Sequence, residues 1–362
     1  MRLDGETLSL KKQKKQKNFI INVSDRCNLR CAYCYIADRF NLPTKTITHE
    51  ILDTFFNKLK EYCLEHKIER IGFTWHGGEP LLAGHSFFSD IIQREKELEA
   101  ELGLIPTSNI IQTNGLLLKG PLLDLLVDNK FNISVSFDGP KDIHDAIRKA
   151  LNGRGSYDLV VDAIQRLNEK GYQCGGITVL NSLHLGRERD LYNSYKEAGL
   201  SSARINPLFA STATKAHSWR SLTPEEISNF YRNLFDIWIE DEKPIRVEPL
   251  VDLTKLAASY RPSVCFFSYK SCSEDWLTIT PNGDAYYCNR FGSNDNVKLG
   301  NIKENTLDEL YANKLRLLGG LVKDIGCPYE SYAEVGSFDA EKAPATQAYR
   351  SVIAYIRKKL EL

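Results

Sequence analysis

The sequence predicts an α/β protein built on a parallel sheet and followed by a smaller cysteine-rich extension. Short runs of β-branched and aromatic residues alternate with longer stretches of helical periodicity, and strands are expected at residues 19–23, 70–75, 109–112, 133–137, 176–180 and 203–207. Strand–helix units in succession imply parallel strands joined by right-handed crossovers. After residue 215 the rhythm changes, with helical stretches expected at 224–240 and 248–259 before a region rich in glycine, aromatic residues and cysteine.

The bulk composition excludes several classes of protein. Hydrophobic residues make up 42% and charged residues 26% of the 362 residues, which is ordinary for a globular chain. The 47 basic residues equal the 47 acidic ones, so no basic face for nucleic acid is expected. No apolar run reaches the ~20 residues of a membrane span, and the N-terminus lacks the apolar core of a signal peptide. We therefore expect a cytoplasmic protein with no membrane or nucleic-acid partner.

The nine cysteines favour metal binding or catalysis, because a reducing cytoplasm does not support a disulfide framework. Three of them form the pattern Cys27-x3-Cys31-x2-Cys34 directly after the first expected strand. Three thiolates in so short a loop can reach one soft metal centre. A single zinc ion would need a fourth protein ligand, and none lies nearby in the sequence. A 4Fe–4S cluster held by three cysteines keeps one iron open to a small molecule.

Other residues with functional character also follow the expected strands. The carboxyl ends of parallel strands meet at one edge of a sheet, where ligands bind in such folds. The sequence therefore predicts an active site at that edge, built from Cys27, residues 76–80, residues 113–115, Asp138 and Asn181.

The segment SDRCNLRCAYCY resembles the signature of the radical S-adenosylmethionine superfamily. In that family the open iron binds S-adenosylmethionine, and reductive cleavage gives a 5′-deoxyadenosyl radical that abstracts a hydrogen atom from substrate. The resemblance implies a partial (β/α)6 TIM-like barrel over residues 18–215, with a small C-terminal cysteine-rich α+β extension. It further implies that S-adenosylmethionine is bound by Tyr33, Gly77, Gly78, Glu79, Pro80, Asn114, Ser134, Ser136, Asp138, Arg148, Val179 and Leu180.

A second set of cysteines, namely Cys265, Cys272, Cys288 and Cys327, lies downstream. A hairpin expected over residues 277–287 would bring Cys272 and Cys288 together. Four thiolates suit a 4Fe–4S cluster or a closed zinc site. The stretch ITPNGDAYYCNRFG resembles the SPASM and twitch extensions of the superfamily, whose cysteines hold an auxiliary 4Fe–4S cluster. Only Cys327 follows Cys288, so we expect one auxiliary cluster and two 4Fe–4S clusters in all.

The residue after Cys288 departs from one branch of the family. In sulfatase-maturing members an aspartate at this position is thought to take up the substrate proton. Asn289 cannot act as a base near neutral pH, which disfavours sulfatase maturation. Candidates for catalytic residues near the auxiliary cysteines are Asp275, Tyr286 and Arg290. Cys63 and Cys174 are expected to be structural.

Two kinds of substrate remain open from the sequence. Similarity of residues 134–172 to peptide-modifying members favours the oxidation or cross-linking, through a carbon–carbon or thioether bond, of a ribosomally made peptide. The alternative is dehydrogenation or epimerisation of a small molecule such as a sugar or aminocyclitol. Either reaction implies a flavodoxin- or ferredoxin-type electron donor. The expected organisation is a basic flexible leader (1–17), the barrel (18–215), a helical linker (216–260), the auxiliary-cluster domain (261–335) and a C-terminal helix (336–362).

Overall fold

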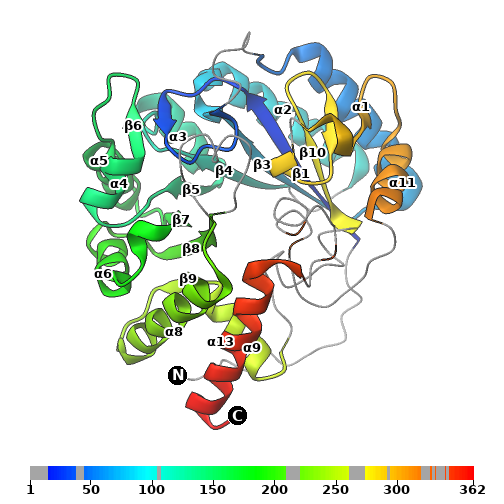
Figure 1. Cartoon of the computed structure of the whole chain (residues 1–362). Coiled ribbons are helices and arrows are strands. Elements are labelled where there is room, and N and C mark those ends of the chain that lie inside the picture. Colours follow the sequence, from blue (N-terminus) through cyan, green and yellow to red (C-terminus); the bar gives the residue numbers. More distant parts are fainter. Residues whose placement is uncertain are drawn as a thin grey trace.

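A ten-stranded sheet organises the chain in the computed structural model (Figure 1). Its strands run in the order β12-β11-β10-β1-β3-β4-β5-β7-β8-β9, and every pairing from β10 to β9 is parallel. A separate two-stranded sheet pairs β2 with β6. The structure describes residues 15–37, 45–103, 107–208, 221–260, 274–291, 294–318, 327, 331, 339 and 342–362.

The strands that form the parallel part of the sheet lie close to the positions expected from the sequence. The strands of the two sheets together are β1 Gln16–Ser24, β2 Leu29–Cys31, β3 Arg70–Gly77, β4 Ser108–Thr113, β5 Asn132–Ser136, β6 Arg148–Ala150, β7 Gly175–Leu180, β8 Ser202–Pro207, β9 Arg246–Glu248, β10 Trp276–Ile279, β11 Asp284–Tyr286 and β12 Lys298–Asn301. The sheet curves without closing, so the prediction of a partial barrel with a C-terminal extension is confirmed (Figure 1).

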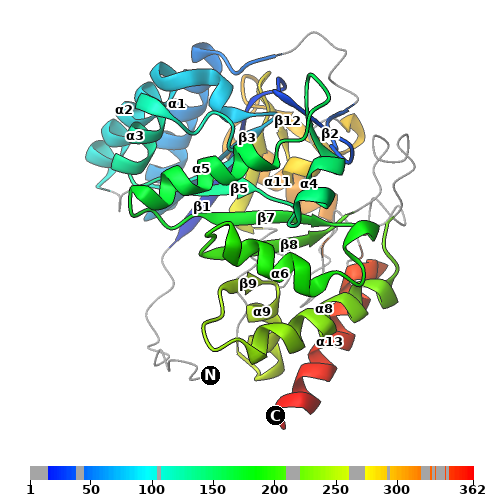
Figure 2. The same cartoon turned by 90° about the vertical axis from the view of Figure 1, so that its left-hand side faces the viewer.

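The helices between the barrel strands cover the outer side of this curved sheet (Figures 1 and 2). The α-helices of the described residues are α1 His49–His66, α2 Gly84–Leu102, α3 Gly120–Asp128, α4 Lys141–Ile147, α5 Tyr157–Glu169, α6 Glu188–Glu197, α8 Pro224–Glu240, α9 Leu250–Ala257, α11 Leu307–Leu318 and α13 Pro344–Leu360. Local signals start several of them. Thr48 caps α1 through a bond from the Ile51 amide, and Thr223 and Glu226 form a reciprocal capping box on α8.

Aromatic packing joins the first strands to the first helix. The Phe19 ring of β1 lies 5.2 Å from the Phe55 ring of α1 in an edge-to-face arrangement, and Phe73 of β3 lies 6.2 Å from Phe55. All three side chains are at most 1% exposed. Because side chains alternate along a strand, burying these rings against the helix turns their neighbours to the inner side of the curved sheet.

The sheet extends on both sides beyond the six strands expected for the barrel. A helix was expected to begin at Glu248. Glu248 instead ends β9, which pairs with β8, and α9 begins at Leu250. On the other side, the hairpin strand β10 pairs in parallel with β1, with Phe19 opposite Leu277. The cysteine-rich extension therefore continues the barrel sheet through direct backbone hydrogen bonds.

Both ends of the described chain are tied to the body of the protein. The expected leader runs to residue 17, but β1 begins at Gln16 and the Lys15 amide donates to the Glu69 carboxylate at 3.1 Å. Residues 1–14 lie outside the described residues. At the other end, α13 packs against α8 and α9 (Figure 1). Within the part of the chain that the structure describes, none of the helices is both long and apolar enough to cross a bilayer.

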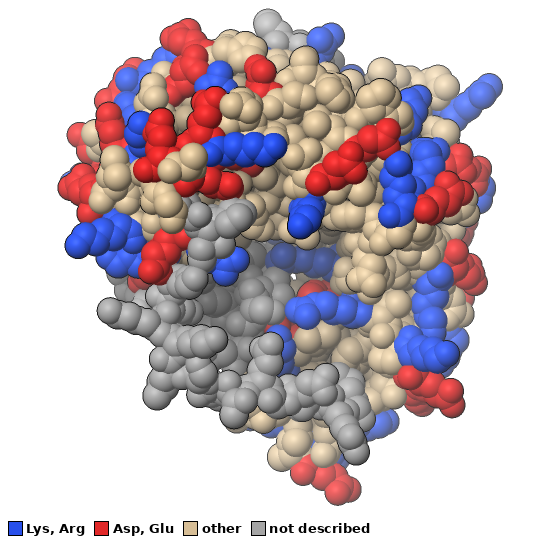
Figure 3. Space-filling view, turned by 180° about the vertical axis from the view of Figure 1, so that it is seen from behind, with Lys and Arg blue, Asp and Glu red and all other residues tan. Residues whose placement is uncertain are grey.

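Acidic and basic side chains are interspersed on the face of the molecule drawn in Figure 3, as the equal numbers of the two charges suggest. Basic side chains border the hollow in the middle of this face.

A buried carboxyl group in α2 makes the stability of the fold depend on pH. Glu95 is 4% exposed, and its Oε2 atom accepts hydrogen bonds from Asn109 Nδ2 at 2.6 Å and Thr107 Oγ1 at 3.0 Å. Burial nevertheless raises the pKa of Glu95 from 4.5 to about 7. The folded protein therefore holds a proton that the unfolded chain releases, and this stabilisation is complete below pH 4.5 and lost as the pH rises through 7.

Replacing Glu95 with glutamine is expected to remove this loss of stability. Glutamine keeps an acceptor for Asn109 but carries no titrating charge. Between pH 4.5 and pH 8, the free energy of unfolding of E95Q should rise by about 3 kcal/mol relative to that of the wild type. Denaturant unfolding of both proteins at a series of pH values measures this difference in the free energy of unfolding. The contributions of the other titrating groups are the same in both proteins and cancel. Parallel pH profiles of the two proteins would contradict the assignment.

Candidate active site

The three clustered cysteines lie on the loop that follows β1, at the carboxyl end of the parallel sheet. Strand β2 ends on Cys31 and pairs with β6, with Cys31 directly opposite Arg148. The Cys34 amide donates to the Cys31 carbonyl at 3.0 Å, which turns the loop back on itself. Cys27 also borders an open cavity of about 330 Å³. The loop is therefore held in place by the small sheet while its thiols stay partly accessible.

The surroundings of these thiols favour a metal centre over free cysteine. Burial raises the pKa of Cys27 to about 11 and that of Cys34 to about 12, as it does for any buried thiol. What distinguishes these cysteines is the set of N–H donors around their sulfurs. Several N–H groups of the described residues point at these sulfurs. The Leu29 amide (3.4 Å) and Asn114 Nδ2 (3.8 Å) donate to Cys27 Sγ, and Arg148 Nη1 (3.6 Å) donates to Cys31 Sγ. Such donors stabilise thiolate ligands.

The spacing of the sulfurs fits a cluster better than a single ion. Four-coordinate zinc, with Zn–S bonds of about 2.3 Å, holds its sulfur ligands within about 4 Å of one another. Among the described residues, Cys27, Cys31 and Cys34 do not form a group whose donor atoms all lie within 4.8 Å. Soft ligands set wider apart, on a partly accessible loop, suit a larger iron–sulfur cluster.

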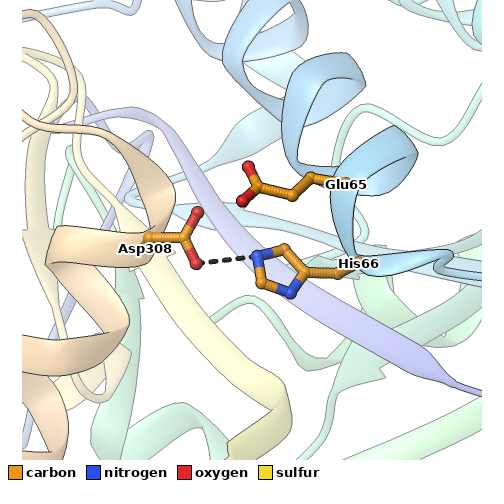
Figure 4. A group of neighbouring side chains, drawn as sticks. All are labelled: Glu65, His66 and Asp308. Carbon is orange, nitrogen blue, oxygen red and sulfur yellow. Dashed lines mark ion pairs between the residues drawn. The ribbon is translucent and has the colours of Figure 1, made fainter.

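Among the described residues, one group of possible metal ligands does have its donor atoms within 4.8 Å of one another, and it lies where α1 meets α11. Figure 4 shows Glu65 and His66 facing Asp308. His66 Nε2 lies 2.7 Å from Asp308 Oδ1, and the His66 ring stacks on Tyr62 with centroids 4.3 Å apart. A histidine at the carboxyl end of one helix and an aspartate in the first turn of another complement both helix dipoles. Because both carboxylates are exposed, the contact is explained by an ion pair that joins the two helices.

Gly77 and Gly78 let the loop after β3 lie directly on the cysteine loop. The Gly78 amide donates to the Ser24 carbonyl at 2.7 Å, and the Glu79 amide donates to the Arg26 carbonyl at 2.8 Å. A Cβ atom on Gly78 would come within 2.2 Å of the Arg26 carbonyl oxygen, and Gly77 has a φ of +124°. Any larger residue would push the two loops apart.

The Glu79 side chain ties these loops to the next strand. Its carboxylate is fully buried and accepts hydrogen bonds from the Leu81 amide (3.0 Å), Thr113 Oγ1 (2.7 Å) and the Asn114 amide (2.8 Å). Burial raises the pKa of Glu79 to about 7. Pro80 is also buried, at the start of the short helix η2 (Pro80–Ala83). The Glu79 side chain therefore has an internal role that positions Asn114 beside Cys27, and the assignment of the backbone of this segment to the cofactor stays a prediction.

Asp138, Tyr33 and Arg148 form a buried network behind the cysteine loop. Asp138 Oδ2 accepts hydrogen bonds from Tyr33 Oη at 2.5 Å and Arg148 Nε at 2.7 Å, and Asp138 Oδ1 accepts one from the Val179 amide at 2.9 Å. Burial alone would raise the pKa of Asp138, but the Arg148 guanidinium outweighs it and the pKa lies below its usual value. The structure thus brings together four residues that the sequence assigned to the cofactor.

The inner side of the sheet carries the remaining residues assigned to the cofactor, with one exception. Ser134 and Ser136 of β5 alternate with buried Val135, and Ser136 Oγ accepts a hydrogen bond from Gln112 Nε2 at 3.1 Å. Val179 packs against the small cluster that contains Tyr33. The Leu180 side chain instead belongs to the main core on the helix side of β7, so a contact of this residue with the cofactor, through its backbone, stays a prediction.

Polar residues on the inner side of β1 and β3 were missed as site residues. Asn22 lies opposite His76, one residue before the Gly77–Gly78 turn. Asn22 is 5% exposed, and its Oδ1 atom has no hydrogen-bond partner among the described residues. His76 Nδ1 accepts a bond from the Gly77 amide at 2.7 Å, and burial lowers the pKa of His76 to about 4. The ring is therefore neutral near pH 7, and its Nε2 atom can form a hydrogen bond with a ligand. A polar residue at every second strand position was the signal for this wall.

The auxiliary region is only partly described. Cys265 and Cys272 lie outside the described residues, so the expected approach of Cys272 to Cys288 stays a prediction. Cys288 and Cys327 are half-buried and pack against the main core. The expected hairpin is present as β10 and β11, with Thr278 opposite Tyr286.

The three catalytic candidates lie in different places. Tyr286 stands on the inner side of the sheet, since Thr278 pairs with Ile20 as well as with Tyr286. Arg290 is close enough to His76 to lower the pKa of this histidine. Asp275 instead acts electrostatically on Lys17, Tyr62 and Tyr311, which belong to the helix side of the sheet. The position of Asp275 therefore does not support a catalytic role.

Asn289 links the two cysteine regions. It lies in the short helix η5 (Asn289–Phe291) directly after Cys288, and its Nδ2 atom donates to Tyr35 Oη at 2.7 Å. Tyr35 directly follows Cys34. Asn289 is 7% exposed, and within the described part of the chain its buried Oδ1 atom has no hydrogen-bond partner. The contact fixes the segment after Cys34 against the segment after Cys288.

Family models match both halves of this arrangement. Residues 21–191 match the model of the radical SAM superfamily, and residues 271–318 match the SPASM model, described as an iron–sulfur cluster-binding domain. The two matches together span more than half of the chain. The chain belongs to the radical SAM superfamily. It is an enzyme with a SPASM-type domain, and it uses S-adenosylmethionine and 4Fe–4S clusters, as the sequence predicted.

Similar proteins of known name include enzymes that mature sulfatases. A serine-type anaerobic sulfatase-maturating enzyme of Bacteroides thetaiotaomicron is 29% identical over 301 residues, covering 78% of this chain and 71% of that protein. A cysteine-type enzyme of Clostridium novyi is 28% identical over 310 residues, covering 80% and 77%.

Solved structures share the fold. The structure of anSMEcpe with bound AdoMet and Cp18Cys peptide has a TM-score of 0.78 at 22% identity, covering 96% of this chain and 98% of that one. Streptococcus suis SuiB bound to the precursor peptide SuiA has a TM-score of 0.56 at 18% identity, covering 82% and 65%.

In this radical SAM enzyme, Cys27, Cys31 and Cys34 would hold the cluster that, with S-adenosylmethionine bound, supplies a 5′-deoxyadenosyl radical for hydrogen abstraction. The chain's own residues orient and shield this site. Glu79 and the two glycines fix the cysteine loop from one side, and the Asp138–Arg148 pair fixes it from the other. His76 offers a neutral imidazole as a hydrogen-bonding group on the inner wall of the sheet.

Proposed function

We propose that the protein removes a hydrogen atom from a residue of a peptide or protein substrate and oxidises it, forming a cross-link. Support for a peptide or protein substrate comes from the similar enzymes, which are named for maturing sulfatases and match over most of their length. A structurally similar chain binds a precursor peptide. Such a substrate suits the polar inner wall of the sheet, where buried Asn22 retains an unpaired acceptor for a peptide N–H.

Asn289 is the observation that favours cross-linking over sulfatase-type maturation. A thiol or alcohol that is oxidised to an aldehyde must lose a proton from the reacting group, and the resemblance assigns this proton to an aspartate after the Cys288 equivalent. The Asn289 amide accepts no proton near neutral pH, and it is already engaged with Tyr35. We therefore infer a reaction that does not depend on a carboxylate at this position. A flavodoxin- or ferredoxin-type protein would supply the electron.

The proposal is tested with reconstituted enzyme, S-adenosylmethionine and dithionite. One arm contains short peptides encoded beside the gene, and the other contains Cp18Cys peptide as a sulfatase-type probe. A product that has lost two hydrogen atoms and shows a linkage in fragmentation spectra supports cross-linking. The expected result with the Cp18Cys peptide is no product that reacts with a hydrazide. An aldehyde from the Cp18Cys peptide, with the neighbouring peptides unchanged, would reject the proposal.

Replacing Asn289 with aspartate is expected to confer aldehyde formation on the Cp18Cys peptide. A positioned general base contributes on the order of 100-fold or more to rate. Hydrazide labelling should therefore rise about 100-fold above the wild-type background. The matched control is N294D, because Asn294 lies in the same segment and only caps η6 (Asp295–Val297) through the Asn296 amide. Equal labelling of both variants would mean that residue 289 does not govern the outcome.

A further inference from the structure

Arg148 places a positive charge directly on the cysteine loop. Its side chain is 7% exposed, and Nη1 donates to Cys31 Sγ at 3.6 Å while Nε donates to Asp138 Oδ2 at 2.7 Å. The backbone supports this geometry, because Arg148 and Cys31 are opposite each other in the pairing of β6 with β2. Arg148 also acts electrostatically on Cys34. The guanidinium is therefore fixed by its partner and by its strand, with one N–H directed at sulfur.

This contact differs in kind from the neutral N–H groups that reach the cysteine sulfurs. The Leu29 amide and Asn114 Nδ2 are neutral donors, and both point at Cys27. A guanidinium is permanently protonated in proteins, so the bond to Cys31 is charge-assisted. Hydrogen bonds to the cysteine sulfurs and the local net charge are among the factors that set the reduction potential of an iron–sulfur cluster. Both factors act most strongly where water is excluded.

We propose that Arg148 sets the reduction potential of the cluster held by Cys27, Cys31 and Cys34. Reduction adds one negative charge to the cluster and its sulfurs, and a directed cationic N–H stabilises that reduced form more than the oxidised one. Arg148 thereby raises the midpoint potential and makes the cluster easier to reduce. The inference rests on the assignment of these three cysteines as ligands. It differs from the role assigned from the sequence, in which Arg148 pairs with the methionine carboxylate.

Asp138 is the positioning partner in this arrangement. Its Oδ2 atom holds Arg148 through Nε, which leaves Nη1 turned toward the loop. Tyr33 donates to the same oxygen, so the carboxylate cannot move toward the cysteines without breaking two hydrogen bonds. The opposite charge of Asp138 also limits the cost of burying the guanidinium.

The test is a redox titration of the holoenzyme without S-adenosylmethionine, followed by electron paramagnetic resonance. The cluster of interest is the one whose signal changes when S-adenosylmethionine is added. We expect Arg148→Met to shift its midpoint potential to more negative values. The control R187M removes an exposed arginine paired with Asp142 and Asp190, and its potential should equal that of the wild type. An unchanged potential in R148M, with only the affinity for S-adenosylmethionine weakened, would overturn the proposal in favour of a carboxylate contact.

Two further measurements cover a variant that fails to fold. D138N/R148M leaves no unpaired buried charge, and its potential should shift in the same direction as that of R148M. In wild-type protein labelled with ¹⁵N-arginine, pulsed resonance of the reduced cluster should detect a nitrogen coupling that is lost in D138N/R148M. Absence of this coupling in the wild type would refute the contact. If the wild type gives no signal that responds to S-adenosylmethionine, the ligand assignment fails, and with it the inference.

Discussion

Replacing Cys27, Cys31 and Cys34 together with alanine is expected to abolish the release of 5′-deoxyadenosine from S-adenosylmethionine. The loop presents three soft donors with N–H groups directed at Cys27 and Cys31, and the variant removes every sulfur of this set. Incubation with dithionite and S-adenosylmethionine, followed by chromatography, measures the product. The loss should be complete, because without thiolates the loop has nothing to bind iron.

The matched control for this prediction is Cys63→Ala. Cys63 lies in α1 and is 3% exposed, and burial raises the pKa of its thiol to about 12, as expected for a cysteine that packs as a small apolar side chain. C63A should retain the iron bound at both sites and should release 5′-deoxyadenosine at the wild-type rate. Undiminished release by the triple alanine variant would reject the assignment of the three cysteines as ligands.

The local elements of the barrel could be predicted because their signals are local. Apolar and β-branched runs marked the strands, and the helical stretch expected at 224–240 matches α8. Strand β9 was missed because it has only three residues and ends in Glu248, so its pattern merges with that of the following helix. The parallel pairing of β10 with β1 joins residues more than 250 positions apart. Nothing in the local pattern of either strand specifies such a partner.

The candidate site shows the same division between local and distant information. Period-two alternation predicts that Val179 and Leu180 face opposite sides of β7, but the sequence does not say which side is the inner one. The structure turns Leu180 toward the helices. Glu79 lies in the segment assigned to the cofactor, yet its carboxylate accepts hydrogen bonds from Thr113 and from backbone amides. Asp275 lies near Cys272 in the sequence but acts on side chains of the helix side. In each case a residue's direction depends on distant packing.

Removing Asp138 alone is expected to destabilise the protein more than removing Asp138 and Arg148 together. In D138A the buried guanidinium loses its partner, and the Tyr33 hydroxyl and the Val179 amide lose an acceptor. Breaking a buried ion pair from one side costs about 3–5 kcal/mol, whereas replacing both partners with apolar groups is often close to neutral. The midpoint of thermal unfolding, measured anaerobically, should therefore be lower for D138A than for D138A/R148M.

The comparison also separates stability from the redox role of Arg148. If Asp138 serves only to neutralise Arg148, the double variant regains most of the stability lost in D138A, because the unpaired charge is gone. Its cluster should still be harder to reduce, since the N–H directed at Cys31 is missing. A double variant as unstable as D138A would place the main contribution of Asp138 in its bonds to Tyr33 and Val179. If D138A/R148M regains stability and its cluster has a lowered midpoint potential, the Asp138–Arg148 pair serves stability and Arg148 alone sets the potential.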